Sequence, residues 1–187
     1  AGSVWVIVAT LHHYIRRIRS MEGRWPGRSE TGMTLAHLGL GIFLVGASLT
    51  NVTSTEKHLR MEADDTFEVA GYIFEFQGTS GVRGPNFVAD EGEFLVYRDG
   101  ERVATLYPQK RRYTSGQVMT EAAIDAGLTR DLFVALGEPL DNQGKAWAVR
   151  LYHKPFIRFI WIGALFMMAG GFLSATDRRY RNKEAAA

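Results

Sequence analysis

Residues 33–49 read MTLAHLGLGIFLVGASL, a run of 17 residues without a charge. About 20 mostly apolar residues are needed for a helix to cross the hydrocarbon core of a bilayer, so this run is at the short limit for a membrane span. Such a span decides the fold class, because it places the rest of the chain on two sides of a membrane. We expect residues 33–50 to form a transmembrane helix.

Two further apolar runs stand near the ends of the chain. The first has no charged segment before it and so lacks the pattern of a signal peptide; we interpret residues 1–15 as the end of a transmembrane helix and the chain as the C-terminal portion of a larger protein. Residues 155–175 form the other run, with one charge, Arg158, near its start, where a long side chain can reach the interface. The sequence therefore predicts two to three transmembrane helices.

Basic residues gather beside these runs. Lys and Arg are enriched in cytoplasmic loops, so we expect residues 16–32 to be a basic cytoplasmic loop and residues 176–187 a cytoplasmic tail. Both clusters then fall on one side, which places residues 51–154 on the other side of the membrane. The basic residues of the flanks are Arg16, Arg17, Arg19, Arg24, Arg28, Arg178, Arg179, Arg181 and Lys183.

The central segment, residues 51–154, is acidic, with 12 Lys or Arg against 16 Asp or Glu. The isoelectric point near 9.0 therefore comes from the membrane flanks. No basic face is left for nucleic acid, which excludes that class of partner. The chain has no cysteine, so this segment must be stabilised by its core alone.

Short runs of β-branched and aromatic residues in the central segment predict strands. Asp99-Gly100 between two alternating runs is the strongest hairpin signal, and residues 120–126 fit either a helical turn or a strand. The basic run Lys110–Tyr113 is typical of a solvated edge strand, or of a surface that faces an acidic partner or haem propionates. We expect an extracytoplasmic β-sandwich or partly open β-barrel. The predicted strands are 66–69, 72–77, 93–97, 102–106, 131–136 and 146–152.

His37 lies inside the apolar run 33–49, where an ionisable side chain is costly without a partner and is a functional candidate for that reason. Gly41 is four residues further on, hence on the same helix face, and leaves room for a flat ligand such as haem. The alternative is a histidine hydrogen-bonded to a neighbouring helix.

The remaining histidines are weaker candidates. His12 and His13 lie near the cytoplasmic end of the first run, and His12 could reach the depth of His37 to form a bis-histidine haem site; the alternative is a polar collar at the membrane surface. His58 and His153 are expected to be solvated. No carboxylate pair, nucleophile elbow or phosphate-binding loop is found, so the catalytic residues are unknown.

A series of motifs, in order from about Thr31 to Arg181, resembles the CcmF-type cytochrome c haem lyases. A paralogous family devoted to nitrite-reductase-type cytochromes shares these motifs. They are Leu35-Ala36-His37-Leu38-Gly39, Gly84-Pro85-Asn86, Met119–Asp125, Arg130-Asp131-Leu132, Ala135–Glu138, Ala146–Arg150, Lys154-Pro155-Phe156 and Asp177–Arg181.

The resemblance implies a multi-pass protein of the bacterial inner membrane, with the central domain in the periplasm. Such proteins attach haem covalently to CxxCH motifs of apocytochrome c. The haem comes from a haem chaperone and the apocytochrome from delivery subunits. They also hold a haem b, thought to reduce the incoming haem with quinol electrons.

In the family, the position of His37 is that of the second transmembrane ligand of haem b. The resemblance places the other ligand, a tryptophan-rich segment and two external histidines upstream of this sequence, which argues against His12 as the partner. Two alternatives stay open: a non-catalytic membrane b-haem or quinol electron-transfer subunit, and a structural docking module of the maturation complex. In each case membrane lipid is expected to contact the protein.

Overall fold

The computed structural model describes residues 2–21, 26–141 and 143–177. The chain divides into a helical unit, Ala1–Val52 with Phe156–Ala187, and a β unit, Thr53–Pro155. Arg24 and the basic tail from Arg178 onward, both used in the predicted topology, lie outside the described residues.

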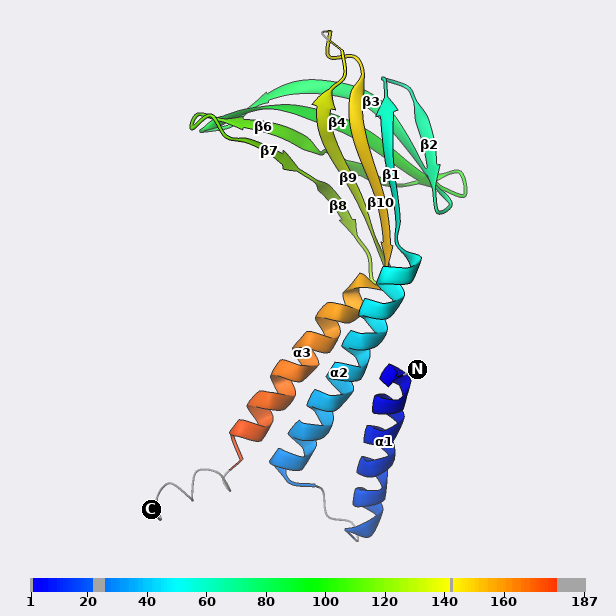
Figure 1. Cartoon of the computed structure of the whole chain (residues 1–187), viewed down its shortest axis with the longest axis vertical. Coiled ribbons are helices and arrows are strands. Elements are labelled where there is room, and N and C mark those ends of the chain that lie inside the picture. The colour runs from blue at the N-terminus through cyan, green and yellow to red at the C-terminus, as the bar shows by residue number, and fades with distance from the viewer. Residues whose placement is uncertain (1, 22–25, 142, 178–187) are drawn as a thin grey trace. The chain divides into compact units, whose positions relative to one another are not determined.

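The described residues of the helical unit form three helices: α1 (Gly2–Ser20), α2 (Arg28–Thr53) and α3 (Ile157–Ala175) (Figure 1). α1 and α2 are longer than the apolar runs that predict them, because a helix does not end where its hydrophobic residues end. At the start of α2, Glu30 complements the helix dipole. The Oδ2 atom of Asp177 accepts the N–H of Ser29 at 2.8 Å, which satisfies one of the donors that a helix start leaves unpaired.

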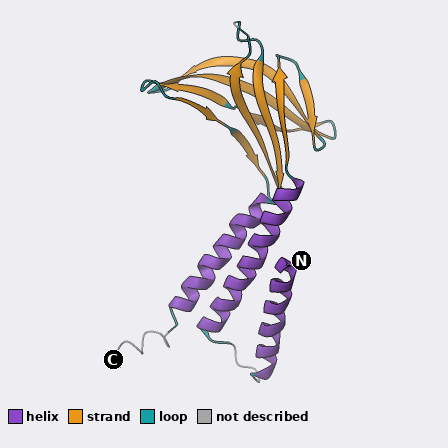
Figure 2. Ribbon diagram, viewed as in Figure 1, coloured by secondary structure: helices purple, strands orange, loops and turns teal. Residues whose placement is uncertain are grey.

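Among the described residues, α2 and α3 are long and apolar enough to cross a membrane. Their composition agrees with two of the predicted spans. Figure 2 shows the two helices side by side.

Glycines line the contact between α2 and α3. Gly32, Gly39 and Gly46 of α2 are seven residues apart, two helical turns, and so share one face. A Cβ atom built on Gly39 would lie 2.6 Å from the carbonyl oxygen of Gly163, and one on Gly46 would lie 2.8 Å from the backbone nitrogen of Ile160. The two helix backbones therefore touch directly, in antiparallel order.

The β unit has two antiparallel sheets. A four-stranded sheet has the order β1-β10-β9-β8, from β1 (Thr55–Met61), β8 (Ala123–Ala126), β9 (Arg130–Pro139) and β10 (Trp147–Pro155). The second sheet has the order β2-β3-β4-β6-β7, and β5 also pairs with β4. Its strands are β2 (Thr66–Val69), β3 (Tyr72–Arg83), β4 (Phe87–Arg98), β5 (Glu101–Leu106), β6 (Gln109–Tyr113) and β7 (Val118–Glu121).

Alternate residues of both sheets form one hydrophobic core, so the predicted β-rich domain between apolar helices is confirmed as a β-sandwich. Phe76 and Phe94 stack at the centre with their ring centroids 4.7 Å apart. Fully enclosed residues from β3, β4, β9 and β10 surround them: Phe74, Val96, Leu132, Val134, Leu136, Val149 and Leu151.

One strand prediction is wrong and one ambiguity is settled. The basic run Lys110–Arg112 lies on β6, which is an interior strand between β4 and β7, not an edge. Its cations are neutralised within the domain, as the Lys110–Glu138 pair shows at 2.6 Å. Residues 120–126 are strands and not a helical turn: they lie on β7 and β8, which are separated by Ala122. β7 belongs to one sheet and β8 to the other.

The chain enters and leaves the sandwich at one end. β1 starts two residues after α2, and its first residue, Thr55, pairs with His153 near the end of β10. Pro155, the last residue of β10, pairs with Arg130, the first residue of β9. Residues at this end of the four-stranded sheet are therefore close in sequence to both apolar helices.

Candidate functional site

His37 is presented on α2 with one ring nitrogen already engaged. Its Nδ1 atom lies 2.8 Å from the carbonyl oxygen of Met33, one turn earlier. A carbonyl can only accept a hydrogen bond, so this geometry assigns the proton of the neutral ring to Nδ1. The Nε2 atom then keeps its lone pair, and the side chain is exposed rather than packed into the helical unit. This tautomer and orientation suit a metal ligand.

A cavity of about 330 Å³ lies between α1 and α2, beside His37. Its walls are mostly apolar, with His13 on the opposite helix. The position of His12 in the sequence made it the candidate partner of His37, but the structure places His13 in the shared cavity. The lining residues are Trp5, Val6, Ala9, Thr10, His13, Met33, Thr34 and His37.

The spacing along α1 explains why His13 and not His12 faces this cavity. Trp5, Ala9 and His13 are four residues apart and so lie on one helix face. His12 lines a different surface hollow, together with His13, Arg16 and Arg17, and is absent from the cavity beside His37. These polar neighbours of His12 are those expected for a polar collar, the alternative to a haem ligand.

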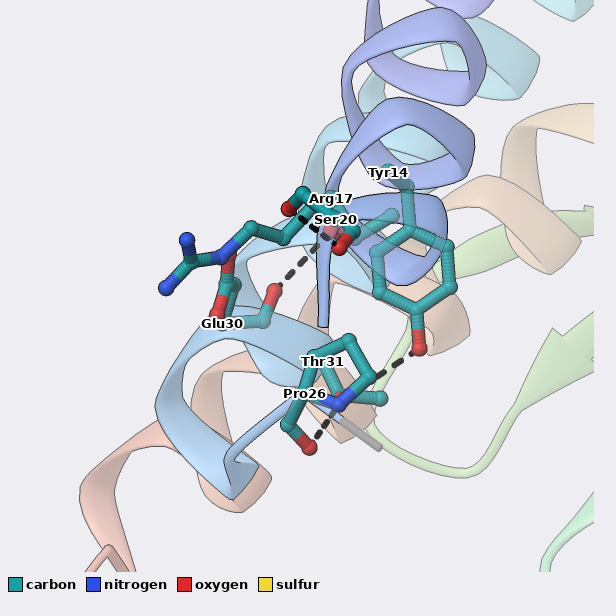
Figure 3. A network of polar contacts seen from close by, with 7 residues as sticks. Tyr14, Arg17, Ser20, Pro26, Glu30 and Thr31 are labelled. Carbon is teal, nitrogen blue, oxygen red and sulfur yellow. Dashed lines mark hydrogen bonds and ion pairs between the residues drawn. The ribbon is translucent and has the colours of Figure 1, made fainter. Parts of the chain in front are cut away.

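Polar contacts hold α1 against the start of α2 (Figure 3). The Nε atom of Arg17 donates to Glu30 Oε1 at 2.8 Å, and the Tyr14 hydroxyl lies 3.4 Å from Thr31 Oγ1. Thr31 Oγ1 also reaches the carbonyl oxygen of Pro26 at 3.4 Å. These contacts fix the end of the helix pair that lies beyond the cavity.

Gly41 faces α1, and the space beside it is filled. A Cβ atom on Gly41 would collide with Cγ1 of Ile7. Gly41 is not among the residues that line the cavity at His37. The room for a flat ligand therefore lies on the side of His37 that faces Trp5 and His13. The haem-facing role of Gly41 stays a prediction.

The arrangement places the Nε2 atom of His37 at the wall of a mostly apolar cavity. The imidazole nitrogen of a histidine in such surroundings fits an axial ligand of haem iron. In the described part of the chain, no three His, Asp or Glu side chains come together as a metal site.

The β unit holds the other two histidines, and they differ. His58 is exposed and contacts Glu56 Oε1 at 2.7 Å, as expected of a solvated residue. The same prediction is wrong for His153, which packs against Tyr72 and has a buried Nδ1 atom. The carboxylates of Glu121 and Asp125 pair with Arg111 and Arg130, so they form no shared acid–base site.

The structure thus defines a class of protein in which a β-sandwich is inserted between two apolar helices. The family described as the CcmF C-terminal beta-sandwich matches residues 52–155, more than half of the chain. The chain therefore belongs to the CcmF family.

Curated relatives extend this match over the helices. The cytochrome c-type biogenesis protein CcmF of Pseudomonas aeruginosa is 49% identical over 97% of this chain and 28% of its own length. The Escherichia coli CcmF is 44% identical over 98% of this chain and 28% of its own length. A paralogue, NrfE of Haemophilus influenzae, is 30% identical over 97% of this chain and 27% of its own length. The chain thus spans about 28% of the CcmF relatives and is more similar to them than to this NrfE.

A solved structure titled cytochrome c haem lyase CcmF has the same fold. It superposes with a TM-score of 0.74 over 90% of this chain and 29% of that chain. The sequence identity is 16%, so this likeness concerns the fold.

Proposed function

We propose that the chain is the C-terminal part of a cytochrome c haem lyase, with His37 as an axial ligand of a haem b. The family membership supports the role in cytochrome c biogenesis. The observation that carries the site is the free Nε2 atom of His37 at an apolar cavity, with Nδ1 held by the Met33 carbonyl. Haem b at this position would supply the electrons that keep an incoming haem reduced.

In this proposal α2 and α3 span the bacterial inner membrane and the sandwich lies in the periplasm. The length and composition of the two helices support it, as do Arg16, Arg17 and Arg19 at the end of α1. The partners are a haem chaperone, apocytochrome c with its delivery subunits, and quinol. The second axial ligand lies on another segment of the whole protein.

The chain's own residues have defined tasks at the site. The Met33 carbonyl fixes the tautomer and the rotation of the His37 ring, so that Nε2 is the atom offered to iron. Trp5, Val6 and Ala9 give the iron-binding side an apolar wall. Arg17 and Glu30 hold the two helices at a constant separation.

Replacing His37 by alanine in the whole protein tests the proposal. We expect the reduced b-type absorption to be lost together with cytochrome c maturation, measured by visible spectra and by haem staining of c-type cytochromes. His12→Ala is the matched control, because His12 lies outside the cavity, and it is expected to retain both.

The other outcomes separate the alternatives. Loss of the haem with intact maturation would favour an electron-transfer subunit that is not needed for attachment. An unchanged spectrum would refute every haem role of His37.

A further inference from the structure

The hydrophobic core of the sandwich ends in a charged layer. Side chains at alternate positions of a strand share a face, and four inward-facing rows finish on polar residues where the chain enters and leaves the domain. The rows are Phe76-Phe74-Tyr72 on β3, Phe94-Val96-Arg98 on β4, Leu136-Val134-Leu132-Arg130 on β9 and Trp147-Val149-Leu151-His153 on β10.

Tyr72 joins the two arginines of this layer. Arg98 Nη1 donates to the Tyr72 hydroxyl at 2.6 Å, and Arg130 Nε donates to the same oxygen at 3.1 Å. Both guanidinium carbons also lie over the Tyr72 ring, 4.9 and 5.1 Å from its centroid. One tyrosine from one sheet thus holds two cations, one from each sheet.

The two arginines of this layer differ in their anionic partners. Arg130 is paired with the carboxylate of Asp125. Arg98 has only Asp99 nearby, 3.6 Å from Nε, and the Asp99 side chain is 93% exposed, so water screens most of that attraction. Asp131 points to the other face of β9, because side chains alternate along a strand. The Arg98 side chain is itself 54% exposed, so its charge lies at the rim of the core and is accessible to an anion.

His153 adds an unsatisfied polar atom to the same layer. Its ring centroid lies 5.7 Å from that of Tyr72, and its Nδ1 atom is buried without a hydrogen-bond partner among the described residues. Buried polar atoms are nearly always bonded to protein, water or a ligand. The unpaired Nδ1 atom indicates that the layer is completed by another molecule, and the exposed Arg98 offers that molecule a cation.

The position of the charged layer in the chain indicates which kind of molecule completes it. Thr55 pairs with His153 and Pro155 pairs with Arg130, so the charged layer lies where the chain joins α2 and α3. Lys154 is next to it, with Nζ 5.3 and 5.2 Å from the rings of Phe133 and Tyr152. Aromatic and basic side chains of this kind are typical of the level of lipid headgroups.

We propose that Tyr72, Arg98 and Arg130 bind the phosphodiester of a membrane phospholipid. A phosphodiester carries one negative charge, and guanidinium groups bind phosphate oxygens in a bidentate manner. The inference rests on the proposed membrane topology of α2 and α3, because that topology brings the headgroups to this end of the sandwich.

Native mass spectrometry of the whole protein in detergent tests this site. The probes are phosphatidylglycerol and a diacylglycerol that lacks the phosphate, with inorganic phosphate as a competitor. We expect one phosphatidylglycerol to be retained, diacylglycerol not to replace it, and Arg98→Gln to weaken retention about tenfold, as for the loss of a charged hydrogen bond. Tyr72→Phe, which keeps the ring and removes the hydroxyl, is also expected to weaken it.

Arg102→Gln is the matched control, because Arg102 is an exposed arginine on the neighbouring strand β5. This substitution removes the same charge as Arg98→Gln. Equal weakening by Arg98→Gln and Arg102→Gln would refute a specific site. Displacement of the lipid by inorganic phosphate would refute the lipid as the source of the phosphate.

These results are separable from the haem proposal. Lipid retention does not depend on His37, so it survives if the spectra of His37→Ala refute the haem. If the protein is released from membranes by alkaline extraction, the membrane topology itself is refuted, whatever Arg98 does.

Discussion

His153 gives the sandwich a pH dependence of known sign. Burial and then the charges of Arg130 and Arg98 lower the pKa of this histidine. Above the ordinary histidine pKa of about 6.5, His153 is neutral in both the folded and the unfolded chain. As the pH falls below that value, the unfolded chain binds a proton that the folded chain does not, so stability is lost as the pH decreases toward the lower, folded pKa.

His153→Gln is therefore expected to flatten the decline of stability below about pH 6.5. The thermal midpoint of the β-sheet circular dichroism signal, followed across that range, measures it. His58→Gln is the control, because His58 is exposed. If the two variants have the same pH profile, the buried histidine is not the cause.

The sequence singles out His37 as a candidate and gives no sign of the charged layer. A histidine in a run without charges stands out from its neighbours, whereas Tyr72, Arg98, Arg130 and His153 come from four strands and meet only through the pairing of the sheets. The choice of His13 over His12 depended on the rotation of α1 about its axis. Trp5, Ala9 and His13 share one face, but which face of α1 turns toward α2 follows only from the packing of the two helices.

At the level of elements, the contact between α2 and α3 predicts that a glycine-to-alanine substitution changes the stability in opposite directions inside and outside the contact. Alanine is a better helix former than glycine by up to about 1 kcal/mol. Gly171 has open space where a Cβ would be, so Gly171→Ala is expected to leave the stability unchanged or to raise it. At Gly39 the added Cβ meets the Gly163 carbonyl, so Gly39→Ala is expected to destabilise by about 1–3 kcal/mol, the range for overpacked sites.

Thermal unfolding of the two variants in the same detergent, read from the helical circular dichroism signal, compares them directly. Matching shifts of the midpoint for Gly39→Ala and Gly171→Ala would mean that the helices do not pack through Gly39.

Strands were predicted where local chemistry marks them. Asp99-Gly100 forms the turn between β4 and β5, with positive φ at both residues, as the hairpin signal requires. β1 was not predicted, since it is a polar strand whose burial shows only at Leu59 and Met61. The interior place of β6 was also missed, because its cations are neutralised by residues that are distant in sequence, such as Glu138.

For the whole molecule, removal of the sandwich separates haem binding from maturation. Deleting residues 51–154 and joining α2 to α3 is expected to abolish cytochrome c maturation while the b-type spectrum remains, because the His37 cavity is lined only by α1 and α2. Spectra and haem staining measure the two properties in one preparation. Maturation by the shortened protein would show that the sandwich is not required for docking.

The pairing of β1 with β10 also sets the order in which the protein can be made. These strands bracket the β unit in sequence, and β1 stands at the edge of its sheet with β10 as its neighbour. During synthesis, β1 emerges first and must wait for nearly the whole domain before its partner exists. Until then it presents an open strand edge, a hazard for aggregation. A ribosome that stalls before residue 147 therefore leaves a product whose smaller sheet lacks β10. Because α3 begins two residues after β10 ends, folding of this sandwich finishes only as α3 is being translated.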